Sequence, residues 1–218
     1  MSSTIEERNT PGNVAPDRIA TIEQLRAILG EPAPITKLKL WTRLEPPAVE
    51  FISRSPFLLL ATADAAGPQD VSPKGDGPGF VAVENERTLL IPDRMGNKLL
   101  FGLQNILANP QVGIVFLIPG TGETLRVNGT AEITAAPDIL ARLTARGQPA
   151  LVAIRITVRE CFFHCAKAFI RSQLWNPASW SHDYRVSFGK MMAPKIGGDD
   201  ATAARIDAAI DADYKHNL

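Results

Sequence analysis

Both cysteines of this chain and one of its three histidines lie in one stretch, RECFFHCAKAFIRSQLW, at residues 159–175. Cys161, His164 and Cys165 are residue types that bind zinc, provided that their side chains converge. The alternating apolar residues before them predict a strand that runs to about Phe163. In a strand Cys161 and His164 point to opposite faces, which disfavours a shared metal ion. The spacing C-x-x-x-C also differs from that of a redox pair, so packing in a strand is the favoured interpretation of both cysteines.

The second half of this stretch carries cations and an aromatic residue at helical spacing. Lys167, Arg171 and Trp175 follow one another at intervals of four, and Ser172 lies beside them. A guanidinium binds phosphate through two hydrogen bonds, and a tryptophan can cover an aromatic ring, so a ligand contact is one interpretation. The other is a partly buried tryptophan flanked by ordinary surface cations. The spacing leaves both open.

A second constellation is IPDRMGNKLL, residues 91–100, where a predicted strand ends and a predicted helix begins. Arg94, Asn97 and Lys98 surround Gly96. The unpaired N–H groups at the start of a helix attract anions, and a nearby arginine and lysine would strengthen a phosphate site. A solvated turn with two surface cations is the alternative.

A third constellation is QDVSPKGDGPGF, residues 69–80, which is rich in glycine and proline. Lys74 lies two residues from Asp76, and the segment is interpreted as a loop whose first part could pair as a strand. Its exposed main chain would let a flat ligand bind to N–H and C=O groups. A plain hairpin connection is the alternative.

The elements that must position these residues are mostly strands. Thr21 and Gly30 mark the two ends of a short helix, TIEQLRAILG, and PPAVEFISRSP predicts a second helix with its prolines in the first turn. The remaining pattern predicts four strands, a helix, two strands, a helix, a strand and a C-terminal helix: 57–64, 69–79, 79–85, 87–93, 96–110, 111–120, 123–134, 136–147, 150–160 and 199–218. Sequential strands with few helices favour an antiparallel barrel over a parallel sheet.

Composition limits the function classes. The chain has 218 residues with 23 basic and 23 acidic side chains, so no overall charge attracts nucleic acid or an anionic membrane. No apolar run is long enough to span a bilayer, and the polar start does not look like a secretory signal, so a cytoplasmic location is expected.

Four segments are predicted along the chain. They are a flexible N-terminal arm (1–19), a helical segment packing on the barrel (20–55), the barrel (56–165) and a C-terminal helical extension (166–218).

The order of several motifs resembles one family. The succession of VSPKGD, a hairpin, IPDRMGNK opening a helix, NPQVGIVFLIPG and LRVNGTAEI is similar to the pyridoxamine 5′-phosphate oxidase-related, FMN-binding split-barrel family, over about residues 45–180. The resemblance implies a mainly β fold, namely a six-stranded antiparallel split β-barrel with flanking helices. It also implies a homodimer with FMN in two sites at the subunit interface.

The resemblance implies cofactor contacts in three places. Around the FMN phosphate they are Ile91, Pro92, Asn97 and Lys98, with Arg94 as a helper. Along the isoalloxazine ring they are Asp70, Val71, Ser72 and Pro73, with Lys74 at the family's substrate-side lysine. Thr124 or Arg126 stands where the oxidases have a glutamine. Arg171, Ser172 and Trp175 are expected to close over the flavin bound mainly by the other subunit.

Departures from the family pattern bear on activity. The oxidases have an arginine where this chain has Gln69, an arginine–lysine pair where it has Asn97–Lys98, and a C-terminal substrate segment that is not recognisable here. The expectation is an FMN-binding flavoprotein and oxidoreductase that differs from pyridoxamine 5′-phosphate oxidase and acts between a small-molecule electron donor and acceptor. A non-catalytic flavin-binding or sensing module is one alternative. A haem or metal protein using His164 and the cysteines is another.

Overall fold

The structure is a computed structural model that describes residues 18–216, in two units, Met1–Lys39 and Leu40–Leu218. Of the predicted arm, residues 1–19, residues 1–17 lie outside the described residues. In the first unit, α1 (Ile22–Leu29) has the predicted ends, because Thr21 and Gln24 form a capping box and Gly30 closes the helix at φ 75°. The short helix α2 (Pro34–Lys37) was not predicted.

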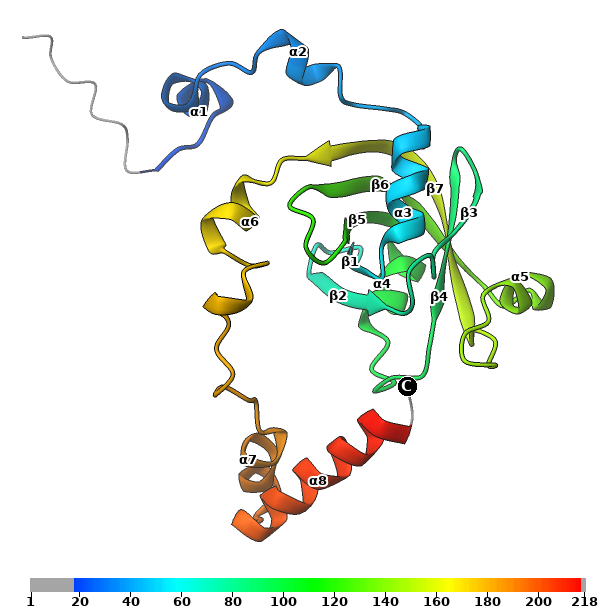
Figure 1. The fold of residues 1–218 in the computed structure, drawn as a ribbon, viewed down its shortest axis with the longest axis vertical. Helices are drawn as coiled ribbons and strands as arrows, with labels where there is room; N and C mark the ends of the chain where they lie inside the picture. Colours follow the sequence, from blue (N-terminus) through cyan, green and yellow to red (C-terminus); the bar gives the residue numbers. More distant parts are fainter. Residues whose placement is uncertain (1–17, 217–218) are drawn as a thin grey trace, which may run out of the picture. The chain divides into compact units, whose positions relative to one another are not determined.

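The second unit is built on one antiparallel sheet of seven strands, in the order β2-β1-β5-β6-β7-β4-β3. The strands are β1 (Phe57–Ala63), β2 (Gln69–Gly75), β3 (Ala82–Asn85), β4 (Thr88–Asp93), β5 (Gln111–Leu117), β6 (Thr124–Thr134) and β7 (Val152–His164). The sheet curls into a split barrel with flanking helices (Figure 1), which confirms the predicted fold class with one strand more than the six that the resemblance implied.

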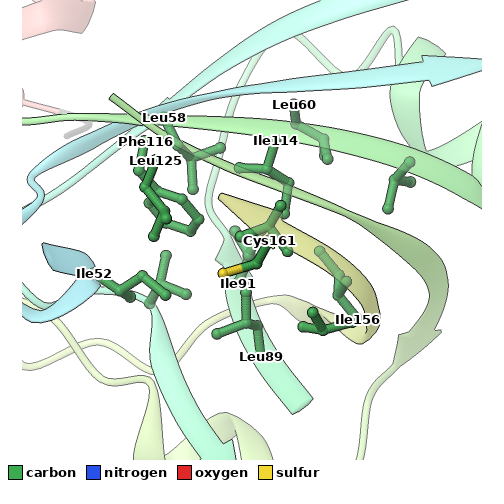
Figure 2. Packing of buried hydrophobic residues seen from close by; sticks show 14 of the residues in the cluster. Ile52, Leu58, Leu60, Leu89, Ile91, Ile114, Phe116, Leu125, Ile156 and Cys161 are labelled. Atoms are coloured by element: carbon green, nitrogen blue, oxygen red, sulfur yellow. The ribbon is translucent and has the colours of Figure 1, made fainter. Parts of the chain in front are cut away.

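Alternation of apolar residues along the strands builds the core. In β1 and β5 every second residue is buried, as expected for strands with one face inside a barrel. Figure 2 shows side chains from β1, β4, β5, β6 and β7 meeting in this core, which includes Leu58, Ile91, Phe116 and Cys161. Fully buried aliphatic and aromatic side chains of this kind supply most of the stability of such a domain.

Three helices flank the barrel. The α3 helix (Pro46–Arg54) forms where predicted and buries Ala48, Phe51 and Ile52 against the core. The α4 helix (Phe101–Ala108) contacts β1, β2 and β6, and α5 (Pro137–Arg142) contacts β7. Both are shorter than predicted: α4 starts five residues late, after two left-handed residues, and α5 ends before a small turn at residues 145–148.

The chain continues beyond the barrel as short helices. These are α6 (Lys167–Ser172), the 3₁₀ helix η1 (Pro177–Ser179), α7 (Phe188–Met192), the 3₁₀ helix η2 (Ala193–Ile196) and α8 (Asp200–His216). The α7 and α8 helices pack on each other, and Gly189 lies so close to the carbonyl of Ala203 that no side chain fits there. Within residues 18–216, no helix combines the length and apolarity needed to cross a bilayer.

Candidate functional site

A cavity of about 720 Å³ opens where β2, the end of β4, the start of α4 and the start of β7 approach one another. Its volume lies within the range of roughly 300–1,000 Å³ that is typical of small-molecule sites. The apolar part of its lining includes Leu60, Phe80, Phe101 and Ile154. The remainder is polar and charged, and it contains most of the residues that the sequence singled out.

The β2 strand forms one wall of this cavity. It pairs only with β1 in the described sheet, so its outer edge presents main-chain N–H and C=O groups that no neighbouring strand uses. Pro73 lacks an N–H, which is tolerated at such an edge. The segment 69–75 is therefore a strand, which confirms that the first part of the predicted loop pairs as a strand. Alternation places Asp70, Ser72 and Lys74 on its half-buried face.

The turn at residues 94–100 forms the second wall. Lys98 and Leu100 both have a φ of 60°, a left-handed conformation that costs a residue with a side chain about 1 kcal/mol or more. Asn97 stabilises the turn, because its side-chain oxygen accepts a hydrogen bond from the Leu99 N–H at 3.0 Å. Strained backbone of this kind gathers at ligand sites.

The first turn of α4 borders the same space. No side chain caps this helix, and its first residues, Phe101 and Gly102, line the cavity. The Asp70 carboxylate accepts a hydrogen bond from Ser72 and lies beside Gly102, where the helix dipole favours negative charge. A Cβ at position 102 would lie at ordinary van der Waals distance from both of these residues, 3.4 Å from Oγ of Ser72 and 3.5 Å from Oδ2 of Asp70.

Two ion pairs join β2 and the residue after it to β4 and the turn that follows. Lys74 pairs with Asp93. Asp76, whose side chain is only 7% exposed, accepts hydrogen bonds from Nε of Arg94 at 3.2 Å and from Nη1 of Arg146 at 3.1 Å, each on a different oxygen. Since β2 and β4 are not neighbours in the sheet, these pairs close the split of the barrel beside the cavity.

The cations that line this cavity differ in which of their hydrogen-bond donors lack a partner among the described residues. Nη1 of Arg94 is buried and has no hydrogen-bond partner among residues 18–216. Lys98 is exposed and makes no ion pair in the described part of the chain. Lys74, Arg94 and Lys98 balance the three lining carboxylates of Asp70, Asp76 and Asp93, so the charge of the lining is close to zero.

The structure brings together most of the predicted cofactor contacts and leaves others elsewhere. Nine line the cavity: Asp70, Val71, Ser72, Pro73, Lys74, Pro92, Arg94, Asn97 and Lys98. Six do not: Ile91, Thr124, Arg126, Arg171, Ser172 and Trp175.

The residues outside the cavity have identifiable surroundings. Ile91 is fully buried in the barrel core (Figure 2), and Thr124 is buried in β6. Arg126 is exposed and lies over the ring of Phe162. Arg171 is also exposed, and it does not line this chain's own cavity.

The spacing of four predicted that Trp175 shares a helical face with Lys167 and Arg171, and the structure shows that it does not. The α6 helix ends at Ser172 because Gln173 is left-handed, so Trp175 lies beyond it. Its ring stacks on Phe169, and its Nε1 donates a hydrogen bond to the carbonyl of Thr121 at 2.8 Å. Trp175 thereby ties this segment to the loop between β5 and β6.

The cysteine–histidine cluster behaves as strand residues do. The β7 strand runs to His164, Cys161 is buried in the core, and burial raises the pKa of its thiol to about 11, with a smaller contribution from the charge of Glu45. Cys165 is exposed just beyond the strand, so the prediction that both cysteines pack in it is wrong for Cys165. Nowhere in residues 18–216 do three or more His, Cys, Asp or Glu side chains gather in an arrangement that could hold a metal ion.

The carboxylates that hold the cations, Asp76 and Asp93, were not among the site residues predicted from the sequence. Lys74 pairs with Asp93 and not with nearby Asp76, because the barrel closes residues distant in sequence upon each other. One signal was present: Asp93 and Arg94 directly end a strand of the hairpin, where side chains reach the rim of a barrel.

Comparison with known families agrees with this architecture. The family model described as "Pyridoxamine 5′-phosphate oxidase" matches residues 44–165, which is more than half of the chain and the whole of the barrel. The fold and the site define a split-barrel protein with a cavity of the size that is typical of small-molecule sites. The chain belongs to the pyridoxamine 5′-phosphate oxidase family.

Solved structures with a similar barrel were also found. HupZ of Group A Streptococcus is 20% identical with a TM-score of 0.45, over 55% of this chain and 92% of that one. HutZ, the heme storage protein of Vibrio cholerae, is 21% identical with a TM-score of 0.41, over 56% and 94%. An FMN-binding protein from Syntrophomonas wolfei is 10% identical with a TM-score of 0.41, over 65% and 95%. No curated protein matches the sequence.

Proposed function

We propose that the protein is an FMN-binding oxidoreductase that functions as a homodimer, with each FMN held between the two subunits. The observation that carries the proposal is the buried Nη1 of Arg94, which has no hydrogen-bond partner among the described residues although Asp76 fixes Nε of the same group. A buried polar atom left unpaired is rare, and a guanidinium in this state is suited to an anionic ligand such as a phosphate.

The residues present fit FMN at both of its ends. Arg94, Asn97 and Lys98 would hold the phosphate, because a guanidinium, an amide and an ammonium group belong to one turn that lines the cavity. The main chain of residues 70–73 would bind the polar rim of the ring through the unpaired edge of β2, with Phe101 and Leu103 among the apolar lining.

The charge balance of the lining supports a contribution from a second subunit. A phosphate ester carries close to two negative charges, whereas the cavity lining of one chain is close to neutral. Additional cations are therefore needed. Arg126 and Arg171 are exposed and are not part of this chain's own cavity lining, and Trp175 could cover a ring, so these residues are proposed to act on the partner's site.

The chemistry that FMN supplies when bound is two-electron transfer. The chain's own part would be to bind the cofactor, orient it against β2 and exclude water with the apolar lining. The absorbance spectrum of the purified protein tests the proposal: a flavin spectrum, or its appearance after addition of FMN, is expected. A colourless protein that ignores added FMN would overturn it.

Two further measurements assign the site and the activity. Lys98→Ala should weaken FMN binding about tenfold, as expected for loss of one charged hydrogen bond; unchanged affinity would place the phosphate elsewhere. Anaerobic addition of NADH or NADPH should bleach the bound flavin. Flavin that stays oxidised with both would instead support a non-catalytic binding module.

A further inference from the structure

The pair of Lys74 and Asp93 is the feature of the cavity that FMN binding leaves unexplained. Both residues line the cavity, and their side chains are only 22% and 15% exposed. Lys74 lies on the half-buried face of β2, and Asp93 is the last residue of β4. The Leu151 N–H donates to the carbonyl of Asp93, which fixes the backbone of Asp93 against the segment entering β7.

This pair changes what Lys74 can bind. An unpaired lysine in a cavity attracts a phosphate, but here the carboxylate of Asp93 already neutralises the ammonium group. A phosphate that approached Lys74 would also approach Asp93, and two anions repel each other strongly in a partly desolvated site. An uncharged ligand meets no such penalty.

The pair also offers a specific pattern of hydrogen bonds. The ammonium group is a donor with three hydrogens, and the carboxylate is an acceptor with two oxygens, of which Oδ1 faces Lys74. A ligand that carries an acceptor beside a donor, as an amide does, satisfies both groups together. Neither a phosphate ester nor a plain hydrocarbon does so.

We propose that Asp93 is a specificity-determining residue, and that with Lys74 it selects an uncharged, amide-like group of the substrate. The pair would reject a substrate phosphate at this position, which differs from the Arg94–Lys98 turn proposed for the FMN phosphate. This inference rests on the proposed function, because it concerns the ligand that would share the cavity with FMN. It assigns this member of the family a substrate class different from that in the family's name.

The test measures affinity by calorimetry for two probes, nicotinamide as a carboxamide and pyridoxamine 5′-phosphate as a phosphate ester. The wild-type protein, saturated with FMN so that the proposed phosphate turn at Arg94 and Lys98 is occupied, should bind nicotinamide more tightly than pyridoxamine 5′-phosphate. Asp93→Asn removes the negative charge and keeps the shape, so it should improve pyridoxamine 5′-phosphate binding at least tenfold. Glu84→Gln is the matched control: Glu84 is also ion-paired and 22% exposed, but it lies outside the cavity, so its loss should change neither affinity.

Lys74→Gln gives a second measurement should Asp93→Asn fail to fold. It should weaken nicotinamide binding and leave the already weak binding of pyridoxamine 5′-phosphate within about threefold. Tighter wild-type binding of pyridoxamine 5′-phosphate than of nicotinamide, or an Asp93→Asn protein with unchanged affinities, would overturn the inference and reduce the pair to a structural link across the barrel. The flavin content of each sample, read from its absorbance, shows separately whether the proposed cofactor is bound.

Discussion

Cys161 and Cys165 are four residues apart, yet the first belongs to the barrel core and the second to the exposed segment that follows it. The barrel, residues 40–164, buries most of its apolar side chains in one cluster with members from five of its seven strands, and a smaller second cluster includes Leu90, Ile139 and Ala153. In the C-terminal segment, residues 165–216, many large apolar side chains stay in water: Ile170 is 70% exposed, Tyr184 81% and Ile196 70%.

The cations of the two regions differ in the same way. Arg94 in the barrel is fixed by a buried carboxylate beside a cavity, whereas Arg171 in the C-terminal segment is exposed and forms no ion pair within the described residues. A cation held in place before a ligand arrives loses less conformational freedom on binding. The difference supports the proposal that the barrel contributes a preformed half of the site and that the C-terminal segment acts on a second subunit.

The largest expected effect is on stability, and it comes from substitution of two glycines that each lie against a carbonyl oxygen. At Gly129 in β6 a Cβ would lie 2.1 Å from the Thr157 oxygen of β7, and at Gly189 in α7 it would lie 1.9 Å from the Ala203 oxygen of α8. Gly129→Ala should destabilise the whole barrel by about 3–5 kcal/mol, the range of severe core substitutions. Gly189→Ala should open only the α7–α8 pair.

Thermal unfolding combined with hydrogen exchange separates the two outcomes. Gly77→Ala is the control, since a Cβ there meets nothing within 4 Å. Equal loss of barrel protection in the two clashing variants would mean that the barrel and the C-terminal segment unfold as one unit, and the contrast between them would fail.

Thiol reactivity should show the next largest difference. Because burial raises the pKa of Cys161 to about 11 from an ordinary value near 9, its thiolate fraction at pH 8 falls about 100-fold. Cys165 should therefore react with a disulfide reagent more than about 100 times faster than Cys161, and Cys165→Ser should remove the fast phase. Two fast thiols at pH 8 would contradict the assignment.

The raised pKa of Cys161 also predicts a pH dependence of stability. From about pH 9 to 11 the unfolded chain loses the thiol proton of Cys161 before the folded chain does, so the barrel should lose stability over that window.

Substitution of one arginine in each region tests the two halves of the proposed site. Arg94→Met should weaken FMN binding about 10- to 100-fold, because a fixed, partly buried charge is lost. Arg171→Met should weaken it less, and only at protein concentrations at which the dimer is present. Fluorescence titration of FMN at several protein concentrations measures both. A larger effect of Arg171 in the monomer would reverse the comparison.

Features that depend on neighbouring residues could be predicted from the sequence, whereas contacts between residues distant in sequence could not. Strands, the α1 caps and the family motifs are local or periodic signals, so the barrel and the end of β4 before the turn at 94–100 could be predicted from the sequence. The pairings of Lys74 with Asp93 and of Asp76 with Arg94 depend on how the barrel closes, which no local pattern encodes. The late start of α4 and the end of α6 depend on single left-handed residues, Leu100 and Gln173, whose types do not signal that conformation.

The smallest expected effect concerns the contact that joins the two regions. Trp175→Phe keeps an aromatic ring to stack on Phe169 but removes the hydrogen bond to the Thr121 carbonyl, which contributes about 1 kcal/mol. Opening of the segment should then become about fivefold more frequent, and trypsin should cleave after Lys167 and Arg171 faster by the same factor. Trp180→Phe is the matched control, because the Trp180 indole bonds to the Leu174 carbonyl within the segment itself. Equal acceleration in both variants would show that Trp175 stabilises the segment locally and does not anchor it to the barrel.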